Sequence, residues 1–177
     1  MPLFKGSFCA KQGVDTLELD TRCESDLFMI TGNCMGDKKG QAKLEKAGYS
    51  MPDQIVLAGR QLGLFMRVEK NQSLIANTLS GLYPKIEAEL NAMGCPVVPP
   101  MYSLKFNEIR LEALAGSFVG VPFTLHWVMQ RPDGSYMDPR TGENYQDFSA
   151  LKKGAKQNIN KWVSYYQSGI SIVVTGD

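Results

Sequence analysis

The sequence predicts an α+β fold, in which helices dominate the first part of the chain and most strands follow. Helix start signals and apolar runs recur between residues 20 and 93, whereas residues 124–142 have the pattern of a β-hairpin around a Pro-Asp-Gly turn. Segregated helices and strands are typical of α+β folds. With 177 residues, 44% of them hydrophobic, the chain is long enough to bury a core, and we expect a single domain over residues 1–177.

The first third of the chain predicts a strand and then a buried helix. Residues 14–19 alternate between apolar and polar side chains, as a short strand does. Thr21 and Glu24 form a capping-box pattern ahead of the apolar run Leu-Phe-Met-Ile, which predicts a helix from about residue 20 to Gly32 or Gly36. The polar residues that follow it, 37–48, indicate a link.

Residues 50–93 predict further helices separated by a strand. A proline at the first helical position and Gly63 after the last indicate a helix over about residues 50–62. Residues 64–68 predict a strand. Residues 73–93 are expected to be helical, with a break near Gly81 and Pro84.

A proline-rich stretch at residues 95–100, Cys-Pro-Val-Val-Pro-Pro, predicts a rigid extended link. Proline fixes φ and biases the preceding residue toward extended backbone, so neither helix nor central strand is expected here. We interpret it as the boundary between a helical lobe, about residues 1–100, and a sheet lobe, about residues 101–177.

The spacing of apolar residues predicts the helices and the strand in the rest of the chain. Residues 106–114 predict a helix that ends before Gly116, and residues 146–166 predict an amphipathic helix. Residues 170–174 form an apolar, β-branched run of the kind found in buried strands.

The hairpin carries the only histidine of the chain and gives it a carboxylate neighbour. Residues 131–134, Arg-Pro-Asp-Gly, predict a type I turn with a glycine able to adopt positive φ. In that loop Arg131 faces Ser135, so His126 and Asp138 share one face as diagonal neighbours, about 7–8 Å apart at the backbone. A two-residue loop would place them on opposite faces. A carboxylate that orients an imidazole is half of a nucleophilic triad.

Composition narrows the classes of partner. The formal charge is +1, which gives no electrostatic reason to expect nucleic acid or an anionic membrane as a partner. The N-terminal residues lack the apolar region of a signal peptide, and no stretch is long and apolar enough for a membrane span. We expect a cytoplasmic protein, or one that a secretion system delivers into a target cell.

The cysteines favour a catalytic thiol over a disulfide or a metal. The chain has Cys9, Cys23, Cys34 and Cys95, with no C-x-x-C pair and one histidine. A cytosolic protein rarely keeps disulfides, and this set does not complete a zinc site. We therefore predict no metal and no other cofactor.

Two cysteines are candidate nucleophiles. Cys23 lies in the first turn of the predicted buried helix, beside Arg22, where the helix N-terminus and the cation both lower a thiol pKa. Cys34 follows Gly-Asn, ahead of a polar, glycine-broken stretch that suits a central helix less well. We prefer Cys23 and retain Cys34 as the alternative. Cys9 and Cys95 are weaker candidates.

These segments together resemble the bacteriocin-processing (double-glycine) cysteine peptidases, a papain-like family. The similarity covers about residues 20–150. Residues 23–36 match its catalytic helix, which begins with the cysteine and ends in glycine, and residues 62–64 match its Leu-Gly-Leu string. The most specific part runs from His126-Trp to Asp138-Pro and Gly142. The resemblance implies a papain-like fold with Cys23, His126 and Asp138 as the catalytic triad.

The chain departs from that family in two places. The family has Cys-Gly-Pro where this sequence has Cys-Glu-Ser at Cys23. The family also has a glutamine about six residues before the cysteine, as an oxyanion donor, whereas residue 17 here is leucine. Gln12 is the nearest upstream candidate for that role.

The resemblance implies a cysteine protease that cuts a protein substrate after small residues, such as a Gly-Gly motif. A papain-like unit without a transporter region resembles the toxic domain of a delivered antibacterial effector, whose partners would include a cognate immunity or inhibitor protein. Two alternatives stay open. One is a glutamine deamidase or transamidase with the same triad; separately, the Gly-Asn-Cys34 string resembles the nucleophile context of some papain-like glutamine deamidases. The other is a papain-like binding module without catalysis.

Overall fold

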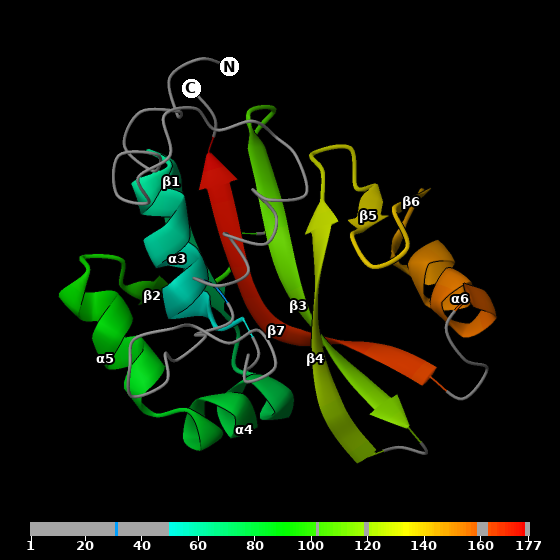
Figure 1. The fold of residues 1–177 in the computed structure, drawn as a ribbon, viewed down its shortest axis with the longest axis horizontal. Coiled ribbons are helices and arrows are strands. Elements are labelled where there is room, and N and C mark those ends of the chain that lie inside the picture. Colours follow the sequence, from blue (N-terminus) through cyan, green and yellow to red (C-terminus); the bar gives the residue numbers. More distant parts are fainter. Residues whose placement is uncertain (1–30, 32–49, 102, 119–120, 159–162, 176–177) are drawn as a thin grey trace, which may run out of the picture. The chain divides into compact units, whose positions relative to one another are not determined.

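The computed structural model describes residues 31, 50–101, 103–118, 121–158 and 163–175 (Figure 1). These residues form helices and one seven-stranded, mostly antiparallel sheet, which confirms the α+β class. The predicted strand at residues 14–19 and the link at 37–48 lie outside the described residues. So does the first predicted helix, except for Thr31, which is helical.

The sheet has the strand order β2-β1-β7-β3-β4-β5-β6. β1 and β2 pair in parallel, whereas β3 pairs antiparallel with both β4 and β7, and β4-β5 and β5-β6 are antiparallel as well. The bounds of the strands are β1 Phe65–Lys70, β2 Val97–Val98, β3 Glu108–Phe118, β4 Val121–Gln130, β5 Tyr136–Asp138, β6 Glu143–Tyr145 and β7 Val163–Thr175.

The chain divides into two compact units, one of residues 1–66 and 85–95 and the other of residues 67–84 and 96–177. The division into lobes of about residues 1–100 and 101–177 therefore stays a prediction. In the first unit, α3 (Pro52–Gln61) packs on α5 (Lys85–Ala92). Their apolar side chains Val56 and Leu90 are buried.

The predicted helix limits around α3 are confirmed. Proline is the first helical residue, and Gly63 follows the helix with a φ of 77°, a left-handed value that favours glycine. The break predicted near Pro84 is confirmed too: α4 (Leu74–Leu82) belongs to the second unit and ends before it. The Ser73 hydroxyl caps α4 by accepting a hydrogen bond from the Ala76 N–H at 3.2 Å.

The proline-rich link is shorter than predicted. Residues 97–98 form β2, which pairs with β1 through Val68 and Val97. The flanking prolines remove backbone donors, so the pairing stops after two residues.

The helix predicted over residues 106–114 is wrong, because these residues form most of β3. Their Glu, Leu and Ala residues favour helix in isolation, but β3 lies between β7 and β4 and exchanges backbone hydrogen bonds with both. Glu108 and Glu112 are buried and have hydrogen-bond partners. Pairing with the two neighbouring strands therefore outweighs the local preference of these residues for helix.

The helix predicted over residues 146–166 is too long. α6 spans Phe148–Asn158, and β7 begins at Val163. The helix starts close to where it was predicted. The Asp147 carboxylate caps this start by accepting a hydrogen bond from the Ala150 N–H at 2.7 Å. The predicted strand at 170–174 is confirmed as the buried end of β7.

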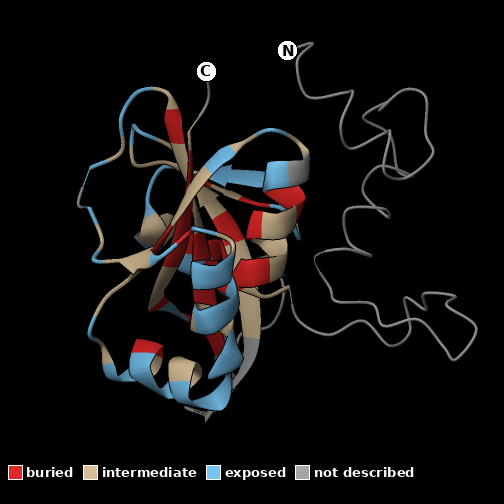
Figure 2. Cartoon of the chain, turned by 90° about the vertical axis from the view of Figure 1, so that its left-hand side faces the viewer, coloured by how far each residue is buried: buried red, intermediate tan, exposed pale blue. Residues whose placement is uncertain are grey.

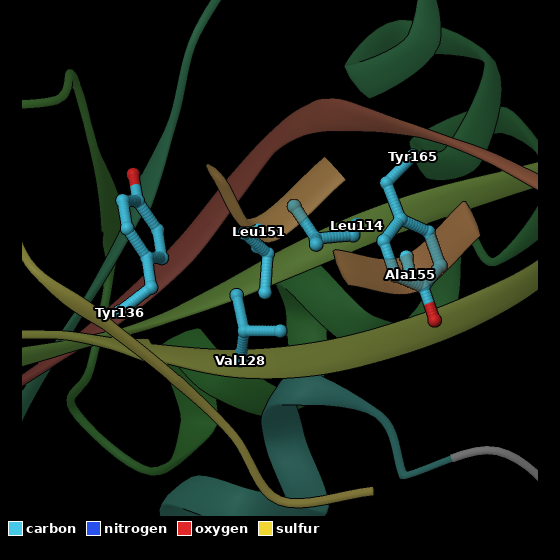
Figure 3. Close-up of a cluster of buried hydrophobic side chains, with 6 residues drawn as sticks. All are labelled: Leu114, Val128, Tyr136, Leu151, Ala155 and Tyr165. Atoms are coloured by element: carbon cyan, nitrogen blue, oxygen red, sulfur yellow. The ribbon is translucent and has the colours of Figure 1, made fainter. Parts of the chain in front are cut away.

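The core of the second unit lies between α6 and the sheet (Figure 3). Buried residues concentrate in the strands of the sheet (Figure 2). β3 to β5 and β7 each contribute a side chain, and α6 contributes two: Leu114, Val128, Tyr136, Tyr165, Leu151 and Ala155. Because His126 is two residues from Val128 on β4, it lies on the sheet face that α6 covers.

Buried charges pair on the same face, along β1 and β3. Arg67 donates to Glu69 at 2.9 Å and to Glu108 at 2.6 Å, and Arg110 donates to Glu69 at 3.3 Å. The Ser171 hydroxyl completes the set by donating to Glu69 at 3.5 Å. The Arg67 hydrogen bond lowers the pKa of the Glu108 carboxyl against the opposing effect of burial. We call these residues the ion network.

The first prediction concerns Glu69, whose side chain is fully buried and accepts from two arginines. Glu69→Gln removes the charge that compensates Arg67 and Arg110, so it should lower the free energy of unfolding by about 2–4 kcal/mol. Urea denaturation of the full chain, followed by circular dichroism, measures the change. Glu143→Gln, at an exposed position, is the control and should change stability by no more than about 0.5 kcal/mol. Equal small effects would contradict a structural role for the network.

The second prediction compares two helical glycines in the second unit. A Cβ at Gly154 of α6 would overlap the Tyr145 ring, whereas a Cβ at Gly81 of α4 meets nothing within 4 Å. Gly154→Ala should therefore destabilise the protein by about 1–2 kcal/mol, because Tyr145 must leave its position against the helix. Gly81→Ala should stabilise it by about 0.5–1 kcal/mol. Thermal denaturation of both variants tests this opposite sign, and equal shifts would contradict tight packing of α6.

Candidate catalytic site

The β4–β5 hairpin has the register that the sequence predicts. The Gly134 N–H donates to the Arg131 carbonyl at 3.0 Å, and the Arg131 N–H donates to the Ser135 carbonyl at 2.9 Å. Gly134 has a φ of 84°, as the predicted turn requires. Pairing of Met129 with Met137 continues this register along the strands. His126 and Asp138 therefore come to the same face, two residues apart diagonally.

His126 and Asp138 are joined by a short hydrogen bond. The His126 Nε2 and Asp138 Oδ1 atoms are 2.7 Å apart, and the Arg140 N–H donates to the same carboxylate oxygen at 2.9 Å. The Asp138 side chain is 1% exposed and that of His126 is 18% exposed. The Asp138 carbonyl accepts from the Gly142 N–H at 2.8 Å, which closes the turn after β5 and fixes the aspartate backbone.

The charge state of Asp138 sets the tautomer of His126. Burial alone would raise the pKa of Asp138, but the hydrogen bonds from His126 and the Arg140 N–H lower it below its ordinary value. An ionised carboxylate only accepts hydrogen bonds, so Nε2 carries the proton and donates it. Nδ1 is then the nitrogen of a neutral His126 that can accept a proton from a nucleophile.

Tyr165 of β7 covers the imidazole. Its ring stacks on His126 with the centroids 5.5 Å apart and the planes inclined by 22°. Gly116 lies opposite Tyr165 on β3, so no β3 side chain occupies that position of the face. Burial and the Asp138 charge raise the pKa of Tyr165, which keeps its hydroxyl neutral. Tyr165 therefore restricts rotation of the His126 ring without adding a charge.

Tyr165 is a site residue that sequence reasoning missed. It lay within the helix predicted over residues 146–166, which assigned it no position beside His126. A signal was present in the sequence, because residues 163–167, Val-Ser-Tyr-Tyr-Gln, are rich in strand-forming residue types. Their pairing partner on β3 was itself predicted as a helix, so the contact could not be inferred.

The structure brings together His126 and Asp138 but does not assign the nucleophile. Cys9, Cys23, Cys34 and Gln12 lie outside the described residues, so their roles stay predictions. Cys95 is 3% exposed, and its Sγ donates to the Met66 carbonyl at 3.6 Å within the first unit. A buried thiol of this kind packs as a small apolar side chain.

Two further observations apply to the part of the chain that is described. It contains no group of three or more His, Cys, Asp or Glu side chains arranged to hold a metal ion. None of its helices has the length and apolar character needed to cross a bilayer.

Comparison with known proteins gives two matches to one family. The family described as "Invasion plasmid antigen J, cysteine protease" matches residues 8–177. The cysteine protease IpaJ of Shigella flexneri is 43% identical over 177 residues, which are the whole of this chain and 68% of the relative. No solved structure is significantly similar.

The third prediction concerns the pH dependence that Asp138 confers. Its pKa is lowered on folding, so its ionised form stabilises the folded state above the unfolded pKa of about 3.9, and this contribution disappears as pH falls toward the folded pKa. Asp138→Asn should cost about 1–2 kcal/mol of unfolding free energy at pH 7. The difference from the wild-type chain should shrink between pH 5 and pH 3, as urea denaturation at each pH can measure. A loss that is constant with pH would assign the effect to packing instead of charge.

Proposed function

Because the chain belongs to the IpaJ family of cysteine proteases, we propose that His126 and Asp138 serve its catalytic thiol, and that the thiol is Cys23. The observation that carries this proposal is the 2.7 Å hydrogen bond between His126 Nε2 and Asp138 Oδ1, held under the Tyr165 ring. It leaves Nδ1 of His126 as the proton acceptor. Nothing else in the described chain offers this combination, since His126 is the only histidine.

The proposed reaction has two stages. The Cys23 thiol gives its proton to His126 Nδ1, and the thiolate sulfur attacks the carbonyl carbon of a peptide bond. The C–N bond then breaks, the His126 imidazolium gives the proton to the leaving amine, and a thioester remains on Cys23. In the second stage His126 takes a proton from water, the hydroxide attacks the thioester, and the proton returns to the sulfur. Asp138 stabilises the imidazolium throughout and keeps its own charge.

Cys23 is preferred because the sequence predicts it in the first turn of a helix, beside Arg22, and a helix N-terminus and a neighbouring cation both lower the pKa of a thiol. Its own backbone N–H is one proposed donor to the oxyanion, and the Gln12 side chain is the other. A donor of this kind contributes about 3–4 kcal/mol to the transition state. Cys34 is the alternative nucleophile.

We further propose a papain-like arrangement and a protein substrate that is cut after small residues such as Gly-Gly. Both follow from the resemblance to the bacteriocin-processing peptidases. The family description as an invasion antigen favours an effector that is delivered into another cell, with an antibacterial toxin as the specific form that we propose. A cognate immunity or inhibitor protein would then be a partner. The departure at Cys23-Glu-Ser leaves the binding module without catalysis as the opposing hypothesis.

The fourth prediction identifies the nucleophile by its reactivity. In the full chain at pH 7, iodoacetamide should alkylate Cys23 faster than Cys34 and Cys95, because only an activated thiol is substantially ionised. His126→Ala should slow the labelling of Cys23 at least tenfold, and Asp138→Ala should slow it less. Peptide mass spectrometry measures each rate, and Cys23→Ala and Cys34→Ala are the matched variants.

Two results would overturn the assignment. Fast, His126-dependent labelling of Cys34 would transfer the role to that residue. If no cysteine labels in a His126-dependent way, Cys23 is not the nucleophile, and the result favours the binding module without catalysis.

Mass spectrometry of a cell lysate treated with the protein separates the reaction classes. New protein N-termini that depend on Cys23 and His126 support proteolysis, and a small residue such as glycine before each cut supports the proposed specificity. A mass gain of about one dalton at glutamine, without new termini, would replace proteolysis by the deamidase that the Gly-Asn-Cys34 context favours. Single replacement of a triad residue should reduce activity by about 10³–10⁴-fold.

A further inference from the structure

A basic pocket lies beside the proposed catalytic pair. It has a volume of about 410 Å³, and α6 and β7 form its walls. Its lining includes three lysines of α6 and three consecutive residues of β7: Lys152, Lys153, Lys156, Ser164, Tyr165 and Tyr166. We call this the lysine pocket, and all of it belongs to the second compact unit.

The charge of this region differs from that of the chain as a whole. The protein has a net charge of +1, yet residues 148–176 contain no aspartate or glutamate and carry Lys152, Lys153, Lys156 and Lys161. Within the described structure, none of the three lysines of the pocket has an acidic partner. The positive charge of the pocket is therefore not neutralised by its surroundings.

Two of these lysines, Lys153 and Lys156, make no stabilising contact within the described residues. Lys152 and Lys156 are one helical turn apart, and like charges at that spacing repel and destabilise a helix. Lys152 also has a packing role, because its Nζ lies 5.2 Å from the centroid of the Phe148 ring. Lys153 and Lys156 are exposed and have no such contact in the described residues. Because the cluster is exposed and has no acidic partner among the described residues, an external anion can approach it.

The pocket and the catalytic pair share a wall. Tyr165 lines the lysine pocket and also stacks on the His126 ring, with the centroids 5.5 Å apart. The Tyr165 ring thus lies between the lysine pocket and the His126 ring. A peptide that presents its carbonyl carbon near His126 passes this ring, and the side chains a few residues from the cut can then enter the pocket.

We propose that the lysine pocket binds an acidic side chain of the protein substrate, a few residues from the bond that is cut. This inference rests on the proposed function, since it needs a peptide at His126. The lysine ammonium groups attract the carboxylate, and the hydroxyls of Ser149, Ser164 and Tyr166 are available as further donors. The pocket would contribute to the choice of substrate, as an addition to the small residue at the cut.

A protein segment fits this pocket better than a membrane surface does. Membrane-binding helices carry large exposed apolar side chains that enter the lipid, and α6 exposes none among its described residues. Tyr166, 48% exposed, is the large apolar side chain that β7 exposes at the pocket.

The fifth prediction uses binding to test the pocket apart from catalysis. The probe is a fluorescein-labelled hexaglutamate peptide, and the protein is the full chain carrying His126→Ala, measured by fluorescence anisotropy at low salt. Lys153→Gln with Lys156→Gln should weaken the Kd about 5–20-fold, because each lysine contributes a modest, partly screened attraction. Lys85→Gln with Lys105→Gln removes the same charge from exposed positions elsewhere and should change the Kd less than twofold.

The catalytic arm uses a pair of peptides that share a cut site and differ in whether glutamates lie two to five residues away. In the chain with intact His126, the Lys153 and Lys156 replacements should raise KM about 5–20-fold for the acidic peptide, with kcat unchanged within about twofold. The neutral peptide should be unaffected. A merely structural role for the lysines would lower the cleavage of both peptides equally.

The outcomes separate this inference from the proposed function. Equal hexaglutamate binding by the two double variants overturns the lysine pocket, even if cleavage depends on His126. Lysine-dependent hexaglutamate binding without any His126-dependent cleavage supports the anion site and overturns the proposed function. Lysine-dependent binding to phosphatidylserine vesicles, with no hexaglutamate binding, overturns the inference in favour of a membrane.

Discussion

The pairing of β3 with strands on both of its sides is the constraint on which the second unit depends. Alternate residues of β3 lie on the sheet face that α6 covers, and each has a different role there. Glu108 joins the ion network, Glu112 accepts a hydrogen bond from Tyr136 at 3.1 Å, and Leu114 lies in the core beneath α6. Gly116, without a side chain, lies opposite Tyr165. A change of one residue in the register of β3 would move all of these to the opposite face.

The position of the proposed catalytic pair depends on a short turn between two strands, one of which pairs with β3. The turn between β4 and β5 determines that His126 and Asp138 share a face, and the hydrogen bonds from His126 and from the Arg140 N–H lower the pKa of Asp138 against the effect of burial. The Tyr165 ring then limits how the imidazole can rotate. Because the pair lies on strands and not on loops, its geometry is fixed before a substrate arrives, which is what proton transfer in a transition state requires.

The second unit contains two contrasting groups of charged residues, one buried and paired and the other exposed and unpaired. In the ion network each buried carboxylate meets a guanidinium, because an unpaired charge at that depth would be very costly. In the lysine pocket, Lys153 and Lys156 are exposed to solvent, which screens their mutual repulsion and permits an unpaired cluster. Paired charges specify the fold, whereas unpaired, solvated ones remain available for an external anion. In the sequence both groups appear only as closely spaced charged residues, and the local pattern does not show which will be paired in the fold.

The sequence by itself determined the α+β class, the limits of α3, the break at Pro84 and the His126–Asp138 pairing. Each of these depends on local rules: proline and glycine at helix ends, and a turn whose length sets which residues share a face. Only the tertiary structure decided that residues 108–118 are a strand, that β7 starts at Val163, and that Tyr165 covers His126. Residues 108–114 have local preferences close to helix, and residues 163–167 follow directly on a helical pattern. The conformation of both segments is settled by partners distant in the sequence, which supply backbone hydrogen bonds and a buried face.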